Sequence, residues 1–469
     1  KGQKLREIFL VFLAALTGIL VRIGRAAEGI LGRTVELIQR AVKAVIRKER
    51  IRRRKRKKNR ARFQKKHTAE EYRNYRIREI LEDLVHYGVW VLGISVLVIT
   101  VGSAGGAMRR AFTPKPEAEP EAEPEIAAEE PAFPEKDIVF GSTGSHMLHD
   151  ALLASYTEDG VSYDFSEIFR YIRPYYSAPD FMTCEFEGSL SGGYYSGYPM
   201  FQSPDDIVRC LQGSGVDLVM LATNHIYDSW TDGFQRTMDT LDKMGIRYLG
   251  IRQKESDRRY YVADVDGIRI GFTNYVYETS SYTYGSKSLN GLEIPDADVN
   301  RICSFDPDDE ASIQNFYREM QENIAGMRRD GAQYLVAQMH WGTEYHLDEA
   351  EYQRKIAAKL CEMGIDALIG GHPHCEQPMD LLTSADGSHS MYCIYSEGNA
   401  LSNQRAELVW DKMPTGHTED GVIVNLSLHQ NGEGEVSLTN VEMIPTWVYR
   451  YMDEMGLYKY YILPLDDVS

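Results

Sequence analysis

Two histidines one residue apart, His372 and His374, follow a short apolar run that ends in the glycine pair Gly370 and Gly371. A continuous apolar run of this length is typical of a buried strand, and the glycines mark its exit from the core. Two imidazoles on such a loop can direct their ring nitrogens at one point, and imidazole is a common ligand of transition metals. The pair therefore raises the hypothesis of a metal site at the end of a core strand.

The same pattern, an apolar run with a polar tip, recurs along the chain. The other tips are Ser145-His146, Glu185-Phe186-Glu187, Asn224-His225, His340 and Glu397-Gly398-Asn399. In α/β domains, the loops that leave the carboxyl ends of parallel strands commonly carry the ligand site. One surface histidine is usually inert, but several tips with Asn, His and Glu at the same kind of position favour a shared site.

The apolar runs predict the core strands, and the segments between them predict helices. The strands cover residues 137–142, 181–186, 217–225, 246–251, 333–342, 366–374 and 391–399, and the helices cover 164–174, 203–212, 231–244, 309–330 and 348–363. Several helices begin after Ser, Thr or Asp, which are favoured capping residues. Two antiparallel hairpins are predicted, with turns at Asp266-Gly267 and Asn431-Gly432. This order predicts an α/β domain with two sheets face to face and helices outside.

Four stretches around these tips resemble the CapA family, the poly-gamma-glutamate capsule synthesis proteins, whose domain is similar to the calcineurin-like metallophosphatases. They are VDLVMLATNHIYDSWTDGFQRTMDTLDKMGIRYLGI (216–251), VAQMHWGTEY (336–345), GIDALIGGHPHCEQPM (364–379) and IYSEGN (394–399), and FEGSLSGG (186–193) is a weaker match. The motifs span residues 137–450. The resemblance implies a metallophosphatase-like two-sheet sandwich flanked by helices, and a membrane-tethered domain preceded by a transmembrane region.

The resemblance also implies a set of metal ligands with an acid–base group beside it. The ligands would be Asn224, His340, His372 and His374, joined by Glu185 and Glu187. His225 would face the substrate as a catalytic residue together with Asp228, and Asp228 and Glu344 are also suited to orient a ligand. Neutral imidazole, amide oxygen and carboxylate suit divalent Mn, Zn or Fe, and binuclear hydrolases hold two such ions about 3.5–4 Å apart.

The sequence departs from the family pattern at the first strand. Ser145 stands where the family has Asp, and Glu185 stands where it has Asn, followed by Glu187. Serine is a poor ligand for the cation that an Asp would bridge. Either Glu185 or His146 restores the ligand set, or the site holds a single metal or none.

The N-terminal part of the chain differs in character from the rest. Residues 1–110 carry 27 Lys+Arg against 9 Asp+Glu, and the remainder carries 25 against 60, so the net charge of −17 conceals two opposite parts. Residues 84–108 contain no Lys, Arg, Asp or Glu and predict a transmembrane helix. Residues 47–66 hold 14 Lys+Arg, which predicts that residues 1–83 are a basic cytoplasmic region. Within it, residues 8–21 form either a second crossing or an interfacial helix.

Three further parts follow the predicted span. Residues 109–136 form a Pro/Glu-rich linker, whose composition predicts an extended spacer. Residues 137–450 form the CapA-like domain, which is expected to be extracellular because the basic region stays inside, and residues 451–469 form a C-terminal tail. The six cysteines show no CxxC spacing, which argues against a zinc knuckle and leaves both disulfides and buried thiols open.

Two functions from different classes follow. The first is a membrane-anchored extracellular enzyme that uses a metal to hydrolyse or transfer at an amide or ester bond of poly-gamma-glutamate or a related envelope polymer. The second is a non-catalytic scaffold with a degenerate metal site that binds the polymer or a synthase. The expected partners are the membrane, anionic lipid at the basic segment, the polymer and a synthase in the membrane. Nucleic acid is disfavoured, because a basic run beside a span binds lipid more simply.

Overall fold

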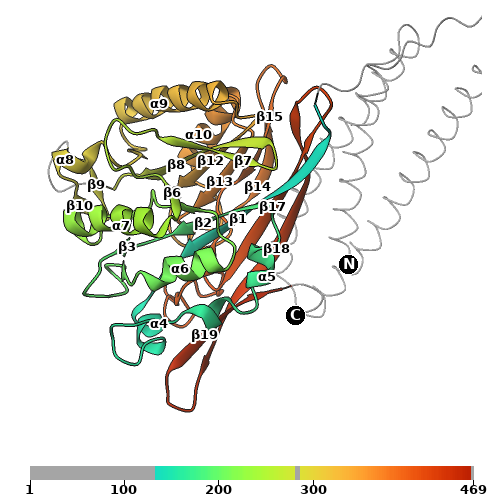
Figure 1. The fold of residues 1–469 in the computed structure, drawn as a ribbon. Helices are drawn as coiled ribbons and strands as arrows, with labels where there is room; N and C mark the ends of the chain where they lie inside the picture. The colour runs from blue at the N-terminus through green and yellow to red at the C-terminus, as the bar shows by residue number, and fades with distance from the viewer. Residues whose placement is uncertain (1–132, 280–285, 466–469) are drawn as a thin grey trace, which may run out of the picture. The chain divides into compact units, whose positions relative to one another are not determined.

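The computed structural model describes residues 133–279 and 286–465, which Figure 1 draws in colour. The predicted basic region, the transmembrane helix at residues 84–108 and most of the linker lie outside these residues. Within residues 133–279 and 286–465, no helix is long and apolar enough to cross a membrane. The described residues therefore correspond to the domain predicted from residue 137 onward, with the last part of the linker before it.

The first of two large sheets is mixed, with a parallel half and an antiparallel half. Its strand order is β19-β18-β17-β1-β2-β5-β6, and β16 also pairs with β1. The strands are β1 (Lys136–His146), β2 (Phe181–Phe186), β5 (Leu218–Met220), β6 (Arg247–Leu249), β16 (Asn399–Leu401), β17 (Asp420–Gln430), β18 (Val436–Met452) and β19 (Tyr458–Pro464). Strands β1, β2, β5 and β6 are parallel, whereas β17, β18 and β19 form an antiparallel extension. The parallel half brings the predicted tips of three strands to one edge.

The second sheet is also mixed, and its order is β11-β8-β12-β13-β15-β14, with β7 paired to β8. The strands are β7 (Tyr260–Val265), β8 (Ile268–Tyr277), β11 (Ser304–Phe305), β12 (Tyr334–His340), β13 (Ala367–Gly371), β14 (Met379–Thr383) and β15 (Ser390–Ile394). Strands β8, β12, β13 and β15 are parallel. This parallel core places the ends of β12 and β13, with their histidines, side by side.

Helices cover the outer faces of both sheets (Figure 1). They are α4 (Asp150–Ser155), the 3₁₀ turn η1 (Ser166–Phe169), α5 (Arg173–Tyr176), α6 (Asp206–Gly213), α7 (Trp230–Met244), α8 (Asp296–Val299), α9 (Glu310–Arg329) and α10 (Glu351–Glu362). The short pairs β3 (Ser189–Leu190) with β4 (Gln202–Ser203), and β9 (Ser288–Leu289) with β10 (Leu292–Glu293), lie in the connections. Helix α7 ends where Gly245 adopts φ 69°, a left-handed cap that suits glycine.

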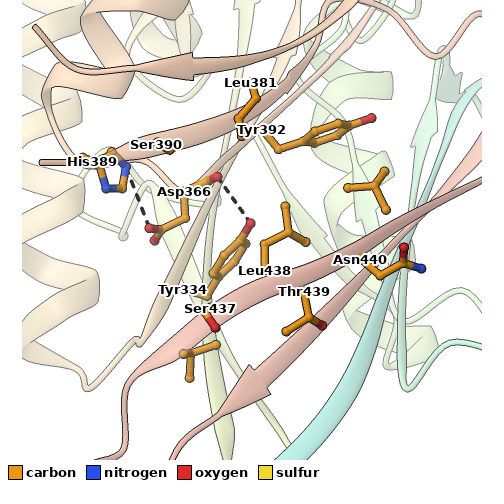
Figure 2. Close-up of a pocket in the computed structure, with 12 residues that line it drawn as sticks. Tyr334, Asp366, Leu381, His389, Ser390, Tyr392, Ser437, Leu438, Thr439 and Asn440 are labelled. Carbon is orange, nitrogen blue, oxygen red and sulfur yellow. Dashed lines mark hydrogen bonds and ion pairs between the residues drawn. The ribbon is translucent and has the colours of Figure 1, made fainter. Parts of the chain in front are cut away.

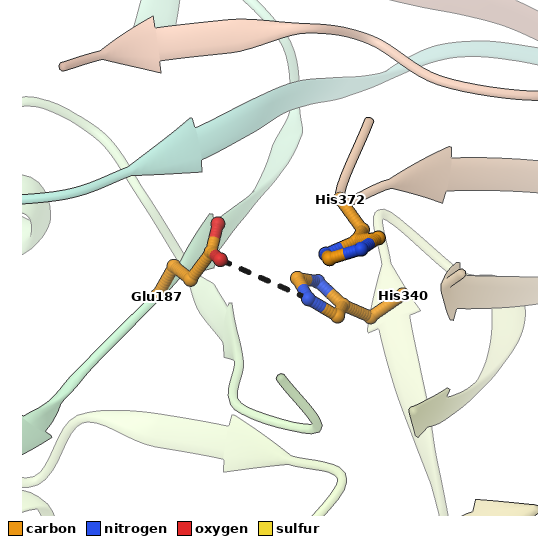
Figure 3. A group of neighbouring side chains, drawn as sticks. All are labelled: Glu187, His340 and His372. Carbon is orange, nitrogen blue, oxygen red and sulfur yellow. Dashed lines mark ion pairs between the residues drawn. The ribbon is translucent and has the colours of Figure 1, made fainter. Parts of the chain in front are cut away.

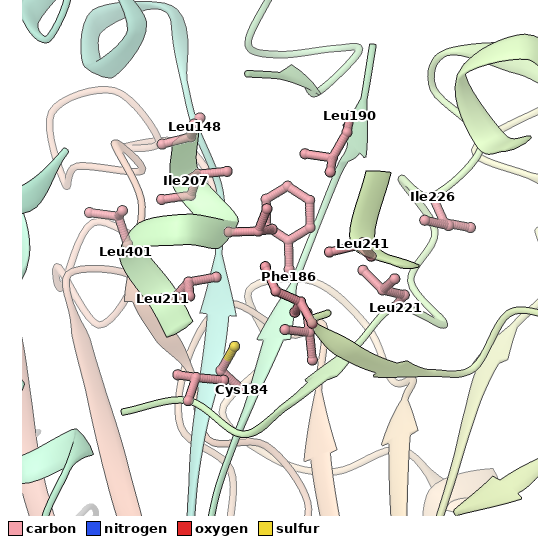
Figure 4. Close-up of a cluster of buried hydrophobic side chains, with 14 of the residues drawn as sticks. Leu148, Cys184, Phe186, Leu190, Ile207, Leu211, Leu221, Ile226, Leu241 and Leu401 are labelled. Atoms are coloured by element: carbon pink, nitrogen blue, oxygen red, sulfur yellow. The ribbon is translucent and has the colours of Figure 1, made fainter. Parts of the chain in front are cut away.

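Three buried apolar clusters hold these layers together. Between the sheets, Phe272 on β8 packs against Phe140 on β1 and Phe181 on β2, with ring centroids 5.2 and 5.3 Å apart. A second cluster fills the space between the first sheet and helices α6 and α7, around Phe186 (Figure 4). A third joins the second sheet to α9 and α10. Burial of each large apolar side chain contributes roughly 1.5–3 kcal/mol to the free energy of unfolding. The positions of the three clusters confirm the predicted α/β arrangement of two facing sheets with helices outside.

The structure differs from the sequence expectations in two places. The helix predicted over residues 164–174 is broken into η1 and α5, because Pro174 lacks the N–H that a continuous helix needs and lies in the first turn of α5. The predicted tail at 451–469 contains β19, which pairs with β18 from Thr446↔Pro464 to Met452↔Tyr458. The first sheet therefore extends past residue 450.

A surface groove of about 590 Å³ lies between β14 and β15 of the second sheet and β18 of the first (Figure 2). Tyr334 and Asp366 line it at the beginnings of β12 and β13. The histidines His340 and His372 lie at the opposite ends of the same strands. The groove is therefore separate from the gathering of polar tips.

Candidate metal centre

The buried carboxylate of Glu187 lies at the centre of the gathered tips. Glu187 follows β2 and is 0% exposed. Its Oε1 lies 3.8 Å from His340 Nε2, and 3.9 Å from the Nε2 atoms of His225 and His374. Figure 3 shows the carboxylate directed at His340, with the His372 ring beside it. Three imidazoles from three different strand ends therefore face one carboxylate oxygen.

Among residues 133–279 and 286–465, neither oxygen of the Glu187 carboxylate has a hydrogen-bond partner. Burial, followed by the negative charge of Glu185, raises the pKa of Glu187 well above its usual range. A buried polar group without a partner costs free energy unless a proton or a cation compensates it. The position is therefore suited to a bound cation.

The hydrogen bonds of His340 also leave acceptors facing one point. Its Nδ1 lies 2.7 Å from Glu185 Oε1, and because a carboxylate only accepts, Nδ1–H donates to Glu185. Its Nε2 lies 2.9 Å from Asn224 Oδ1, whose amide is fixed because Nδ2 donates to Asn290 Oδ1 at 3.0 Å. In the neutral imidazole, Nε2 and Asn224 Oδ1 are then two acceptors that a shared cation would satisfy.

Glu185 orients His340 instead of facing the same point as Glu187. Both of its oxygens are engaged, because Ser145 Oγ donates to Oε2 at 2.6 Å while Oε1 accepts from His340. The close approach also accounts for Gly371, where a Cβ would lie 2.3 Å from Glu185 Oε2. The sequence analysis counted Glu185 among the ligands, but its carboxylate instead accepts a hydrogen bond from the far nitrogen of His340, as carboxylates commonly do behind metal-bound histidines.

His372 and His374 both have left-handed backbone conformations. His372 has φ 95° and His374 has φ 58°, conformations that are uncommon for residues other than glycine and concentrate at functional sites. Their rings lie 5.8 Å apart, and the His372 ring lies 4.8 Å from that of His340. Burial and the charge of His340 lower the pKa of His372 well below its usual range and that of His374 to about 3. Both imidazoles are therefore neutral, as metal ligands must be.

His225 is held by Asp228 with its other nitrogen toward Glu187. His225 Nδ1 donates to Asp228 Oδ2 at 2.7 Å, and the same oxygen accepts from the Phe201 backbone N–H at 2.5 Å. His225 Nε2 is then the unprotonated nitrogen; it accepts from Asn290 Nδ2 at 3.1 Å and lies 3.9 Å from Glu187 Oε1. Asp228 is buried and acts through His225, so its contacts support the orienting role and not direct contact with substrate.

The structure directs His146 away from the site. Its Nε2 lies 3.1 Å from the Tyr176 hydroxyl, and its Nδ1 lies 3.1 Å from both the Gly144 and Glu185 carbonyl oxygens. Burial lowers its pKa to about 4. His146 therefore does not replace the missing Asp at Ser145, and the alternative in which it restores the ligand set is wrong.

Two overlapping groups of side chains could hold ions. Glu187, His340 and His372 form one group, and Glu344, His372 and His374 form the other, with the ligand atoms of each group within 4.8 Å of one another. His372 belongs to both. The mixed nitrogen and carboxylate donors fit a divalent transition metal, as expected from the sequence. Glu344, which the sequence analysis treated as an orienting residue, thus lies among the possible ligands.

Comparison with known proteins places the chain in a family. The family described as bacterial capsule synthesis protein PGA_cap matches residues 139–404. The chain is 22% identical to the PGA biosynthesis protein CapA of Bacillus subtilis (strain 168), covering 63% of the chain and 70% of that protein, and 23% identical to the capsule biosynthesis protein CapA of Bacillus anthracis, covering 67% and 71%.

Two solved structures were also matched. The calcineurin-like phosphoesterase YfkN from Bacillus subtilis has a TM-score of 0.37 and 16% identity, covering 66% of this chain and 91% of that chain. The Haemophilus influenzae NAD nucleotidase (NadN) has a TM-score of 0.36 and 12% identity, covering 70% of this chain and 60% of that chain. The match to the capsule synthesis family, over residues 139–404, includes the strands and loops that carry Glu187, His225, His340 and His374. The protein therefore belongs to the family of bacterial capsule synthesis proteins.

Proposed function

We propose that the protein is a metal-dependent hydrolase or transferase that acts on an amide or ester bond of a capsule or related envelope polymer. The observation that carries the proposal is the Glu187 carboxylate, which is buried, has no hydrogen-bond partner in the described part of the chain and has three imidazole nitrogens within 3.9 Å. A scaffold that only binds polymer would gain nothing from the cost of burying this group. Poly-gamma-glutamate is the polymer implied by the resemblance to the CapA family, whose Bacillus subtilis member is a PGA biosynthesis protein.

In this proposal, one set of residues binds the metal ion and His225 transfers a proton. Glu187, Asn224, His340, His372 and His374 would hold the metal, with Glu344 toward the second group. A bound Mn, Zn or Fe ion would supply Lewis acidity toward a carbonyl oxygen and lower the pKa of a coordinated water. His225 Nε2 accepts a proton, and its hydrogen bond to Asp228 keeps Nδ1 protonated and the ring fixed.

We further propose that this domain lies outside the cell, anchored by the apolar segment at residues 84–108. The sequence supports this location through an uncharged span, a basic segment at residues 47–66 on its N-terminal side and a Pro/Glu-rich linker after it. In this arrangement, anionic lipid binds the basic segment and the linker holds the site away from the bilayer, where the polymer and a synthase in the membrane can reach it.

The proposal is tested by metal content and by hydrolysis. The purified chain should retain a transition metal in near-stoichiometric amount, measured by inductively coupled plasma mass spectrometry, and should shorten poly-gamma-glutamate. His372→Ala removes the residue shared by both groups, so metal and activity should be lost together while the fold is retained. His429→Ala is a matched control, because this histidine lies at the far end of the first sheet beside Asp137. Full activity of a metal-free protein would contradict the proposal.

A second function rests on one observation. Ser145 donates a hydrogen bond to Glu185 where an ion ligand was expected from the family pattern. A scaffold that binds polymer or synthase through a degenerate site would tolerate this change. Its signature is a wild-type protein that binds no metal, shows no thermal shift with Mn²⁺ or Zn²⁺, and still binds the polymer.

A further inference from the structure

The loop at residues 402–419, between β16 and β17, is tied to the candidate metal centre by a chain of hydrogen bonds. His374 Nδ1 lies 3.1 Å from Asn399 Oδ1, and Asn399 Nδ2 donates to Gln404 Oε1 at 2.9 Å. Gln404 Nε2 then donates to the Tyr345 hydroxyl at 3.2 Å. Asn399 Nδ2 also donates to the Thr418 carbonyl at 2.9 Å, which fixes the other end of the loop. The loop is thus positioned by the same residues that position His374.

Tyr345 is the point at which this loop meets the site. It is half-buried, its ring centroid lies 6.0 Å from that of His374, and its backbone N–H donates to the Pro373 carbonyl at 2.8 Å. It has φ 63°, a conformation that tertiary contacts must enforce in a tyrosine. The ring is therefore held rigidly beside the His-Pro-His turn, with one face toward the 402–419 loop.

Lys412 lies over that face. Its Nζ is 5.1 Å from the Tyr345 ring centroid, within the range of a cation–π contact. The side chain is exposed, and within the described part of the chain its ammonium has no ion pair or hydrogen bond. The nearby cations Arg405 and Arg450 are instead paired with Glu419 and Glu407. Lys412 thus presents an unpaired positive charge one ring away from His374.

We infer that Lys412 is the residue that binds a carboxylate of the substrate beside the metal centre, with Tyr345 as its positioning residue. This inference rests on the proposed function for the position of the reacting bond. The residues after 110 carry 60 Asp+Glu against 25 Lys+Arg, so an anionic chain approaches against repulsion. A cation held beside His374 by an aromatic ring and a hydrogen-bonded loop offsets that repulsion next to the candidate metal centre. The Lys412 ammonium donates hydrogen bonds to the substrate carboxylate, and no covalent bond of either group is made or broken.

The test uses the full-length chain loaded with Mn²⁺ and two probes. One is an N-acetylated trimer of γ-linked glutamate, and the other is the same trimer with its carboxylates converted to amides. In a calorimetric titration, Lys412→Met should weaken binding of the acid trimer about tenfold, the order expected for one charge-assisted hydrogen bond, and should leave the amide trimer unchanged. Lys412→Arg should restore binding of the acid trimer. The loss should shrink at high salt, because the Debye length falls from about 10 Å at 0.1 M to about 3 Å at 1 M.

Controls separate this inference from the proposed function. Lys355→Met removes an equal charge from the outer surface of α10, where Lys355 pairs with Glu351, and should leave binding of both trimers unchanged. Metal content is measured in every variant. If the wild-type protein binds no metal or hydrolyses nothing, and Lys412→Met still weakens binding of the acid trimer, the enzyme proposal is overturned and the assignment of Lys412 as an anion site stands. Normal metal content with a Lys412→Met affinity within about twofold of wild type, an equal loss for the amide trimer, or no binding of the acid trimer would overturn the assignment of Lys412.

Discussion

Replacing Glu187 with glutamine should stabilise the metal-free protein and reduce the stabilisation that bound metal adds. Because the pKa of Glu187 is raised by burial and by Glu185, the folded chain keeps a proton that the unfolded chain loses above a pKa of about 4.3. The free energy of unfolding of the metal-free protein therefore falls as the pH rises from the unfolded to the folded pKa. Glutamine does not ionise, so the variant should lack this fall and be more stable by about 1–3 kcal/mol near neutral pH.

The stabilisation added by bound metal should be smaller in the variant. Metal bound only to the folded chain adds about 4.1 kcal/mol when its concentration is about 1,000 times Kd. A hundredfold weaker Kd in Glu187→Gln would remove about 2.7 kcal/mol of this, since each tenfold change is about 1.4 kcal/mol. The loss is expected because the amide oxygen carries no charge toward the three imidazoles within 3.9 Å of Glu187 Oε1.

The assay is urea unfolding followed by circular dichroism, with excess EDTA or excess Mn²⁺, at pH values from about 5 to 8. Glu433→Gln is the matched control, because this glutamate is exposed in the turn between β17 and β18. A Glu187→Gln protein that is less stable without metal, or equally stabilised by Mn²⁺, would refute the reasoning. Either result would mean that the carboxylate has a protein partner and does not face an ion.

Three further predictions test other parts of the structure. Ser145→Asp replaces a donor to Glu185 with a second buried carboxylate and should lower the free energy of unfolding of the metal-free protein by about 1–3 kcal/mol; an unchanged urea midpoint would contradict the 2.6 Å hydrogen bond. Phe272→Ala removes the ring shared by two contacts between the sheets and should cost about 3–5 kcal/mol in the same assay, whereas a cost under about 1 kcal/mol would place it outside the core. Protease added to intact cells should digest the chain beyond residue 114 and spare residues 47–66; protection of the C-terminal domain would reverse the proposed orientation.

The arrangement of the core could be predicted from the sequence because strand runs and their polar tips are local signals. The run before His372 predicted β13, and the run before His340 predicted β12, so their convergence followed from parallel pairing. Pro174 was also a local signal, of a helix break, but the prediction gave more weight to the helical spacing of the apolar residues over 164–174. Strand β19 was missed because its aromatic run, Tyr458 to Pro464, follows the end of the family motifs.

The roles of individual side chains were less accessible. Glu185 lies in β2 and Glu187 directly follows this strand, and both were expected to be metal ligands. The structure separates them, because Glu185 reaches His340 on the opposite sheet and Glu187 does not share that bond. Asn290, which accepts from Asn224, comes from the β9–β10 turn and carries no motif. Such roles depend on contacts between residues far apart in the chain, which a single sequence does not encode in any local pattern.

The candidate metal centre draws its members from both sheets. Glu187 and Asn224 follow strands of the first sheet, whereas His340 and His372 end strands of the second. An ion bound among them would link the two sheets and fix the distance between them. The affinity for the ion would therefore depend on how well the two sheets pack. Substitutions at Phe140 or Phe272, which are buried between the sheets, should therefore weaken metal binding by shifting one layer against the other. Since the ligands meet only when both sheets have docked, the ion would also bind late in folding and distinguish completed molecules from those with a single formed layer.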